Sequence, residues 1–246
     1  MRRRIAIVLC VFLVATCEEA RAEWVLELYT GSSWTRDSNL RVTQSASDSD
    51  ATFGDVHWEA RPFEDSPYYG LRVAYYPSAA ARLGATFDFT HYKMYAVTDR
   101  TTSVSGRWNG VPLNERAPLA SRVQALEISH GVNLAALNAE YRWTDADSVG
   151  GFARGWSTHA GAGIVGYWPH AEGLINDVPV GADYRYAGSG VQIFGGGEYR
   201  LNRRFGLLIE GKAEAGKLDI DLVPQTRIVT HTRTLHALAG VTLHLQ

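Results

Sequence analysis

Two stretches in which apolar and polar residues alternate constrain this chain more than any other feature of its sequence. They cover residues 83–95 and 126–134. Their apolar positions are Leu83, Ala85, Phe87 and Phe89 in the first stretch and Leu126, Ile128, Val132 and Leu134 in the second. Side chains of a β-strand point alternately to its two faces, so a period of two indicates strands whose faces meet different surroundings. The sequence therefore predicts β-strands with one apolar and one polar face.

A hairpin signal lies between these two stretches. Asn109-Gly110 strongly indicates a tight turn, because both residues tolerate a positive φ. A hairpin with its tip at this place makes Phe89 face His130 and His91 face Ile128. The two apolar rows then fall on the same face of one long antiparallel ribbon.

The start of the chain has the features of an export signal. Residues 1–22 contain three arginines directly after Met1, a short apolar run and an A-x-A cleavage site at 20–22, which predicts a secretory signal peptide and a mature domain over 23–246. A lipoprotein acylated at Cys17 is a less favoured alternative. Cys10 is the other cysteine of the sequence, so the predicted mature chain has no thiolate for a disulfide or a metal.

Composition excludes several other classes of protein. The formal net charge is -2, which gives no basic surface for binding nucleic acid. No apolar run in residues 23–246 approaches the ~20 residues of a membrane helix. The chain reads as an exported all-β protein with a single domain.

Long and short connections alternate between the predicted strands. The long connections cover residues 32–67, 96–123, 169–186 and 215–230, and the short ones 77–82, 144–155 and 201–204. This layout predicts an all-β, eight-stranded antiparallel transmembrane β-barrel of the cell outer membrane, with long extracellular loops and short periplasmic turns. Residues 53–63 would make a ninth strand, and we interpret them as the upper part of strand two, interrupted by a bulge near 62–67.

The two faces of these strands fit a membrane position. Charged residues predicted to fill the lumen and to pair with one another are Glu27, Arg72, Asp88, Glu127, Glu198, Arg200, Glu210, Lys212 and Glu214. Aromatic residues predicted to form the periplasmic girdle are Trp24, Tyr76, Trp143, Trp156, Tyr199 and Phe205, with Tyr95, Tyr167 and Trp168 at the opposite ends. A soluble lipocalin-like barrel would place the apolar face inward, and the inward charges favour the membrane version over it.

Four segments carry a resemblance to a known family: residues 27–31, 89–95, 167–172 and 195–200. They resemble proteobacterial outer-membrane β-barrel proteins of the OmpA/OmpX-like group, in particular the branch labelled lipid A oxidase that is found in rhizobia and relatives. The resemblance covers essentially the whole of 23–246.

That resemblance implies oxygen-dependent oxidation of the proximal glucosamine of lipid A to 2-aminogluconate. It implies molecular oxygen as co-substrate and a divalent metal cation, and it supplies no set of catalytic residues. It also implies a monomer whose partners are outer-membrane lipids, lipopolysaccharide and the barrel assembly machinery, and not nucleic acid. One departure is the final Gln246, where such barrels usually carry an aromatic residue that this machinery reads.

His91 and His130 are the leading candidates for catalysis, together with Lys93. Their parity places them on the lipid-facing rows at the level of the outer-leaflet headgroups, where they could bind phosphate or hold a metal near a sugar. Two alternatives stay open: a bulge near Gly131 turns one histidine inward, or both are ordinary interfacial side chains.

Two His-x-Glu pairs are candidates for metal binding. His57 and Glu59 share one face of a predicted extracellular segment, and His170 and Glu172 repeat the spacing on an external loop. An imidazole and a carboxylate two residues apart can supply two metal ligands. A solvated rim is the simpler explanation for the first pair.

The remaining histidines and acidic residues have weaker claims. Another possible cation cluster consists of Asp219, Asp221 and His231, and the histidines assigned to the lumen are His159, His236 and His244. The function that the resemblance implies is a lipid A-modifying enzyme, with the external histidines and carboxylates as its candidate site. A non-catalytic barrel for envelope integrity or adhesion is the alternative, and a narrow pore is the least favoured.

Overall fold

The described strands close into a barrel. The computed structural model describes residues 22–64, 66–143 and 155–245. The eight barrel strands within this part are β1 (Glu23–Thr35), β5 (Tyr69–Tyr76), β6 (Leu83–His91), β11 (Leu134–Trp143), β12 (Trp156–Tyr167), β15 (Gly188–Arg200), β16 (Phe205–Leu222) and β17 (Thr226–Leu245). Each is antiparallel to its neighbours, and β1 pairs with β17 to close the barrel. The predicted fold class is confirmed.

The outer wall of the barrel is apolar. Leu137, Ile164 and Leu235 expose 61%, 66% and 59% of their surface, whereas residues of the opposite parity are buried in the lumen. The ten residues of β11, tilted by about 40°, span about 25 Å, which is the height of the apolar band of outer-membrane barrels. The barrel is therefore a transmembrane barrel of the outer membrane. No helix among the described residues is long and apolar enough to cross a membrane.

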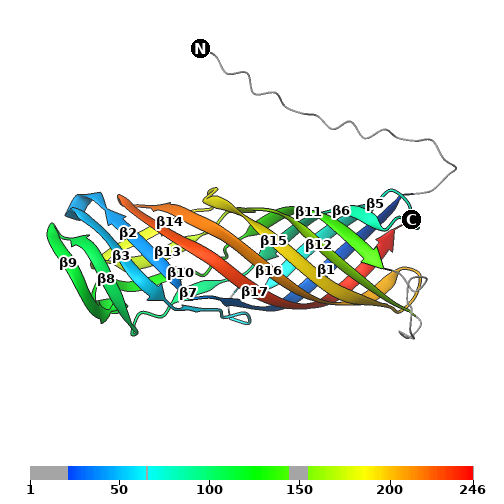
Figure 1. The fold of residues 1–246 in the computed structure, drawn as a ribbon, viewed down its shortest axis with the longest axis horizontal. Helices are drawn as coiled ribbons and strands as arrows, with labels where there is room; N and C mark the ends of the chain where they lie inside the picture. The colour runs from blue at the N-terminus through cyan, green and yellow to red at the C-terminus, as the bar shows by residue number, and fades with distance from the viewer. Residues whose placement is uncertain (1–21, 65, 144–154, 246) are drawn as a thin grey trace, which may run out of the picture.

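Aromatic side chains mark both edges of the apolar wall. At the end where β1 begins and β17 ends, Trp24 packs against Tyr75 with ring centroids 4.9 Å apart (Figure 1). The neighbouring Tyr76 was predicted for this girdle but points into the lumen, where it donates a hydrogen bond to Glu140. Tyr167 at the other end is likewise buried in the lumen, so the prediction was wrong for these two tyrosines, whereas Trp168 is exposed as predicted.

An ion network fills the middle of the lumen. Arg72 is fully buried and donates hydrogen bonds to Asp88 (3.0 Å) and Glu210 (2.8 Å), while Lys212 lies 2.7 Å from Asp88. The predicted pairing of inward charges is confirmed here. These groups occupy the space through which a pore would run.

The predicted lumen histidines join this interior. His159 bonds to Glu210 at 2.9 Å, His236 to Tyr68 at 3.0 Å and His244 to Glu198 at 2.7 Å.

Beyond the membrane the long connections are strands, not loops. One group extends the sheet from β17: β2 (Ser38–Gln44), β3 (Ser49–Val56), β8 (Thr101–Trp108) and β9 (Val111–Pro118). A second, five-stranded sheet runs β14 (Val178–Ala182), β13 (Ala171–Ile175), β10 (Val123–Ile128), β7 (Met94–Ala96) and β4 (Trp58–Glu59). The 3-10 helices η1 (Ser45–Ser47) and η2 (Leu119–Ser121) complete the described elements. This region lies at the end opposite the start of β1 and the end of β17 (Figure 1), so it is extracellular.

Two predicted connections are corrected by this arrangement. Residues 53–63 do not extend strand two, because β3 pairs with β2 and β8, and β4 joins the second sheet through β7. Residues 215–230 are the upper part of the continuous β16–β17 hairpin, whose last pair joins Leu222 to Thr226.

The predicted long ribbon is also corrected. Asn109-Gly110 does form the hairpin tip, with Trp108 paired to Val111. The register does not continue, because β6 pairs with β11 and β7 pairs with β10. Leu126 and Ile128 are therefore 2% and 1% exposed, in an apolar core outside the membrane rather than against lipid.

We expect Arg72→Ala to lower the free energy of unfolding by about 3–5 kcal/mol, because it leaves Asp88 and Glu210 buried with less compensating charge. Urea unfolding of the barrel in lipid vesicles measures this change. Arg41→Ala is the matched control, since Arg41 pairs with Asp50 on the surface and such pairs contribute at most about 1 kcal/mol. Equal losses in both variants would show that the lumen network does not stabilise the barrel.

Candidate metal centre

The segment between β10 and β11 places His130. Gly131 and Asn133 have φ values of +101° and +45°, which fold the chain sharply after β10. Two backbone hydrogen bonds attach this turn to the segment before β13: His170 donates to the Gly131 carbonyl (3.1 Å), and Trp168 donates to the Asn133 carbonyl (3.0 Å). His130 and His170 are thereby held side by side although they lie far apart in the sequence.

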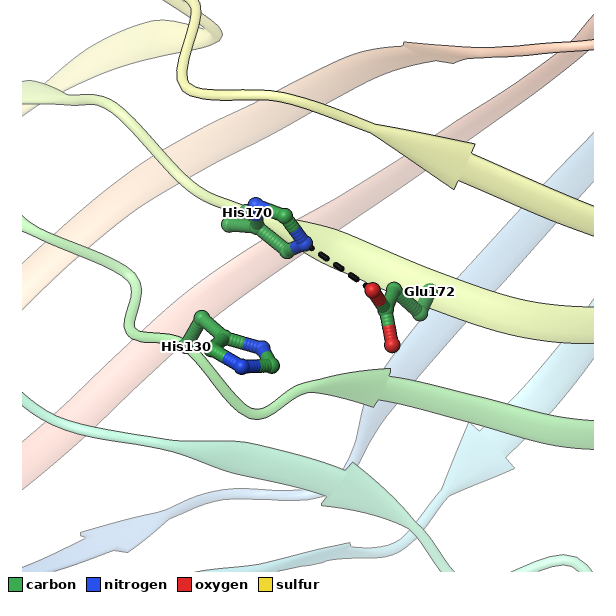
Figure 2. Close-up of side chains that lie close together, drawn as sticks. All are labelled: His130, His170 and Glu172. Carbon is green, nitrogen blue, oxygen red and sulfur yellow. Dashed lines mark hydrogen bonds and ion pairs between the residues drawn. The ribbon is translucent and has the colours of Figure 1, made fainter. Parts of the chain in front are cut away.

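Three potential metal ligands converge at this place. The imidazole rings of His130 and His170 have centroids 4.8 Å apart, and His170 Nε2 lies 3.1 Å from Glu172 Oε1. Figure 2 shows the three side chains pointing toward one another. One ligand atom from each residue lies within 4.8 Å of the others.

Two histidines and one carboxylate suit a first-row transition metal. This set, with positions left open, is typical of non-haem Fe(II) sites that use oxygen. Ligands about 2.1 Å from one ion are at most about 4.2 Å apart, so binding requires a small rotation of a side chain. His130 is exposed and can make that rotation.

A fourth residue gives independent support for a cation. Glu127 of β10 pairs directly with Glu172 of β13, which places two carboxylates opposite each other on neighbouring strands. Like charges in this relation destabilise a sheet, and a bound cation removes the repulsion. Glu127 was predicted to face the lumen, and this prediction was wrong because β10 lies outside the barrel, in the five-stranded sheet.

His91 lines a pocket of about 420 Å³ together with His130. It stacks on Tyr69 at 4.7 Å, and its Nδ1 bonds to Asn133 at 2.9 Å. The outward parity predicted for His91 holds, but the turn at Gly131 covers it, so that it is 4% exposed. We call this space the histidine pocket; its lining is Ser66, Tyr69, Phe89, His91, His130, Asn133, Trp168 and Tyr184.

Lys93 is buried at the wall of a second pocket of about 610 Å³. Arg61, Glu127 and His130 line the same space. His130 belongs to both pockets and therefore stands between them.

The other predicted metal ligands lie elsewhere. His57 Nδ1 bonds to Asp37 at 2.7 Å, and Glu59 lies 3.9 Å from Arg61, so this pair does not join His170 and Glu172.

The acidic cluster near the top of the β16–β17 hairpin is occupied by cationic side chains. Asp219 accepts hydrogen bonds from Arg227 at 2.6 and 2.8 Å and from Lys217 at 3.0 Å. Asp221 lies 3.9 Å from Arg227. His231 pairs with Lys217 across the two strands, and these residues do not form a group of metal ligands.

Sequence reasoning missed two residues that shape the site. Tyr184 packs against His170 with ring centroids 5.2 Å apart and donates a hydrogen bond to the His130 carbonyl at 3.1 Å. Asn133 orients His91. The sequence indicates only the turn itself, because Gly131 and Asn133 both tolerate a positive φ.

Comparisons with known proteins show no family for this chain. No family model matches the chain, and no curated protein matches it in sequence. The solved structures that are similar include the outer membrane protein OprG from Pseudomonas aeruginosa, with 10% identity, a TM-score of 0.48 and coverage of 92% of this chain and 96% of that one.

Two further structures are similar at the same level. Neisserial surface protein A has 11% identity and a TM-score of 0.42, covering 91% of this chain and 98% of its own. The outer membrane protease OmpT from Escherichia coli has 10% identity and a TM-score of 0.41, covering 91% and 96%. At this distance the similarities carry no information on substrate or activity.

We expect Gly131→Ala to weaken metal binding at least tenfold while the barrel still folds. A Cβ at this position would lie 2.2 Å from His91 Nδ1, and the φ of +101° disfavours alanine, so the turn that holds His130 must move. Titration with Co²⁺, followed by its visible absorption, measures the affinity. Gly181→Ala is the control, because its nearest contact would be an ordinary 3.7 Å; unchanged affinity in both variants would contradict this account of the turn.

We expect the extracellular end of the β16–β17 hairpin to lose stability as the pH falls from about 4 to about 2. The hydrogen bonds from Arg227 lower the pKa of Asp219 to about 2, so its stabilising contribution is present above its ordinary pKa and is lost on protonation. Hydrogen exchange of the hairpin amides at several pH values measures the loss, relative to Asp219→Asn. An identical pH dependence in both proteins would exclude Asp219 as the cause.

Proposed function

We propose that this barrel is an outer-membrane enzyme that oxidises the proximal glucosamine of lipid A, with molecular oxygen as oxidant and a divalent metal held by His130, His170 and Glu172. The observation that carries the proposal is the convergence of two imidazoles and one carboxylate at the outer edge of the barrel. The resemblance of the sequence to the lipid A oxidase branch supplies the substrate and the type of reaction.

The position of the three ligands supports a lipid headgroup as substrate. They lie outside the lumen and beside Trp168 and Tyr184, which are exposed aromatic residues of the kind that settles at the interface between lipid and water. The sugars and phosphates of lipid A occupy that level of the outer leaflet. A substrate in the leaflet therefore reaches the site from the side, without entering the barrel.

The reaction has a simple balance. Two electrons and two protons leave C1 and the attached hydroxyl of the reducing-end hemiacetal, giving a lactone that water opens to the acid, while oxygen accepts the electrons and protons as hydrogen peroxide. A metal in this site would bind and activate oxygen.

The chain's own residues have separate roles in this proposal. His130, His170 and Glu172 hold the metal. His91 lies in the same pocket as His130 and is the candidate base for the C1 hydroxyl, and Asn133 orients its ring. Lys93 and Arg61 line the neighbouring pocket and supply positive charge for an anionic group of the lipid other than the 1-phosphate.

We expect expression of this protein to add one oxygen atom to the proximal sugar of lipid A, in the presence of oxygen only. The measurement is mass spectrometry of lipid A from a Gram-negative host whose lipid A lacks the 1-phosphate, so that the hemiacetal is free. His130→Ala and Glu172→Gln should abolish the gain, because each removes a metal ligand. His57→Ala is the control and should retain it, because His57 bonds to Asp37 away from the site.

Unchanged lipid A from cells in which the barrel is folded in the outer membrane would overturn the proposal and favour the non-catalytic barrel. A different modification that still requires His130 and Glu172 would keep the enzyme and discard the oxidation.

A further inference from the structure

The lipid-facing wall of the barrel has a hollow next to the histidine pocket. Three outward residues with small side chains lie side by side on neighbouring strands: Ala135 of β11 pairs with Gly166 of β12, which pairs with Ser189 of β15. The next outward level toward the periplasm carries Leu137 and Ile164, which are 61% and 66% exposed. Small side chains above bulky ones leave a shelf in the wall.

Aromatic rings bound the shelf on its extracellular side. Trp168 and Tyr186 pack against each other with ring centroids 5.6 Å apart. A Cβ on Gly166 would lie 2.7 Å from the Trp168 ring, so the indole packs directly over the bare backbone of Gly166. The resulting groove measures about 500 Å³, and Phe87 lines its other flank. Its surroundings are almost wholly apolar.

The groove adjoins the histidine pocket, to which the candidate metal ligand His130 also contributes. Trp168 lines both the groove and the histidine pocket, and His130 lines both the histidine pocket and the pocket of Lys93. Three spaces therefore follow one another along the wall: the apolar groove in the hydrocarbon layer, the histidine pocket at the interface and the polar pocket of Lys93 beyond it. This order matches the order of acyl chain, sugar and anionic group in the lipid.

We infer that the groove binds an acyl chain of lipid A from the outer leaflet and so sets the depth at which the proximal sugar meets the metal; the identity of this lipid rests on the proposed function. The groove faces hydrocarbon between exposed Leu137, Ile164 and Phe87, where an acyl chain is the available ligand. Burying methylene groups against the groove adds dispersion contacts that a smooth wall lacks. In this inference the small residues of the shelf determine which lipid is bound, although they lie away from the reacting atoms.

The test fills the shelf and measures lipid binding. Ala135→Leu combined with Ser189→Leu replaces two small outward residues by bulky ones that remain compatible with a lipid-facing wall. Ala237→Leu combined with Ala239→Leu makes the same kind of change on β17, where both residues are exposed. Native mass spectrometry of the detergent-solubilised barrel with hexa-acylated lipid A, and with phosphatidylethanolamine as competitor, gives the affinities.

We expect the filled variant, Ala135→Leu with Ser189→Leu, to bind lipid A at least tenfold more weakly than the wild type does. The control variant on β17 should bind lipid A as tightly as the wild type. Equal binding by all three proteins would overturn the inference, as would equally weak binding by the filled variant and the control. Full displacement of lipid A by equimolar phosphatidylethanolamine would also overturn it, because the groove would then accept any acyl chain.

The outcome is separable from that of the proposed function, because the measurement is binding and needs no metal. Wild-type protein that binds lipid A in the groove but leaves it unoxidised would retain this inference and overturn the oxidase. If cells that express the filled variant oxidise lipid A as much as cells with the wild-type protein do, the proposed oxidase activity is retained and the inferred role of the groove is overturned.

Discussion

The ion network around Arg72 is the constraint on which the rest of this structure depends. A barrel of eight strands encloses only enough space for side chains, and here that space holds a guanidinium, an ammonium and their carboxylate partners. These groups fill the middle of the lumen, so the interior is a support rather than a channel. The candidate metal centre lies outside the lumen, among the extracellular sheets.

The barrel could be predicted from the sequence because the pattern that specifies each strand lies within that strand. Alternation specifies a strand with two unlike faces, and inward charges with outward Leu137 and Ile164 identify the membrane version. Alternation does not say what covers the apolar face. Leu126 and Ile128 show the same period as Phe87, yet they pack in a protein core above the membrane. For this reason the extracellular sheets could not be predicted from the sequence. The prediction of a loop at residues 215–230 was wrong because the β16–β17 hairpin continues through them.

The candidate site was only partly predictable. His170 and Glu172 lie two residues apart, and their proximity follows from strand geometry alone. The same spacing at His57 and Glu59 does not form a metal site, because His57 bonds to Asp37 in the turn between β1 and β2. That His130 would join His170 depends on the turn at Gly131 and on two backbone hydrogen bonds between distant segments. Contacts between segments so far apart in the sequence cannot be predicted from the spacing of residues.

The lipid binding that we infer for the hollow formed by Ala135, Gly166 and Ser189 has a kinetic consequence. A site that opens sideways into the leaflet meets its ligand by diffusion in two dimensions, so its occupancy follows the mole fraction of that lipid in the membrane and not a concentration in water. Detergent micelles of different size would change its apparent affinity by dilution alone. The viscosity of the leaflet would also set the rate of encounter, which makes the stiffness of the surrounding membrane part of the reaction environment.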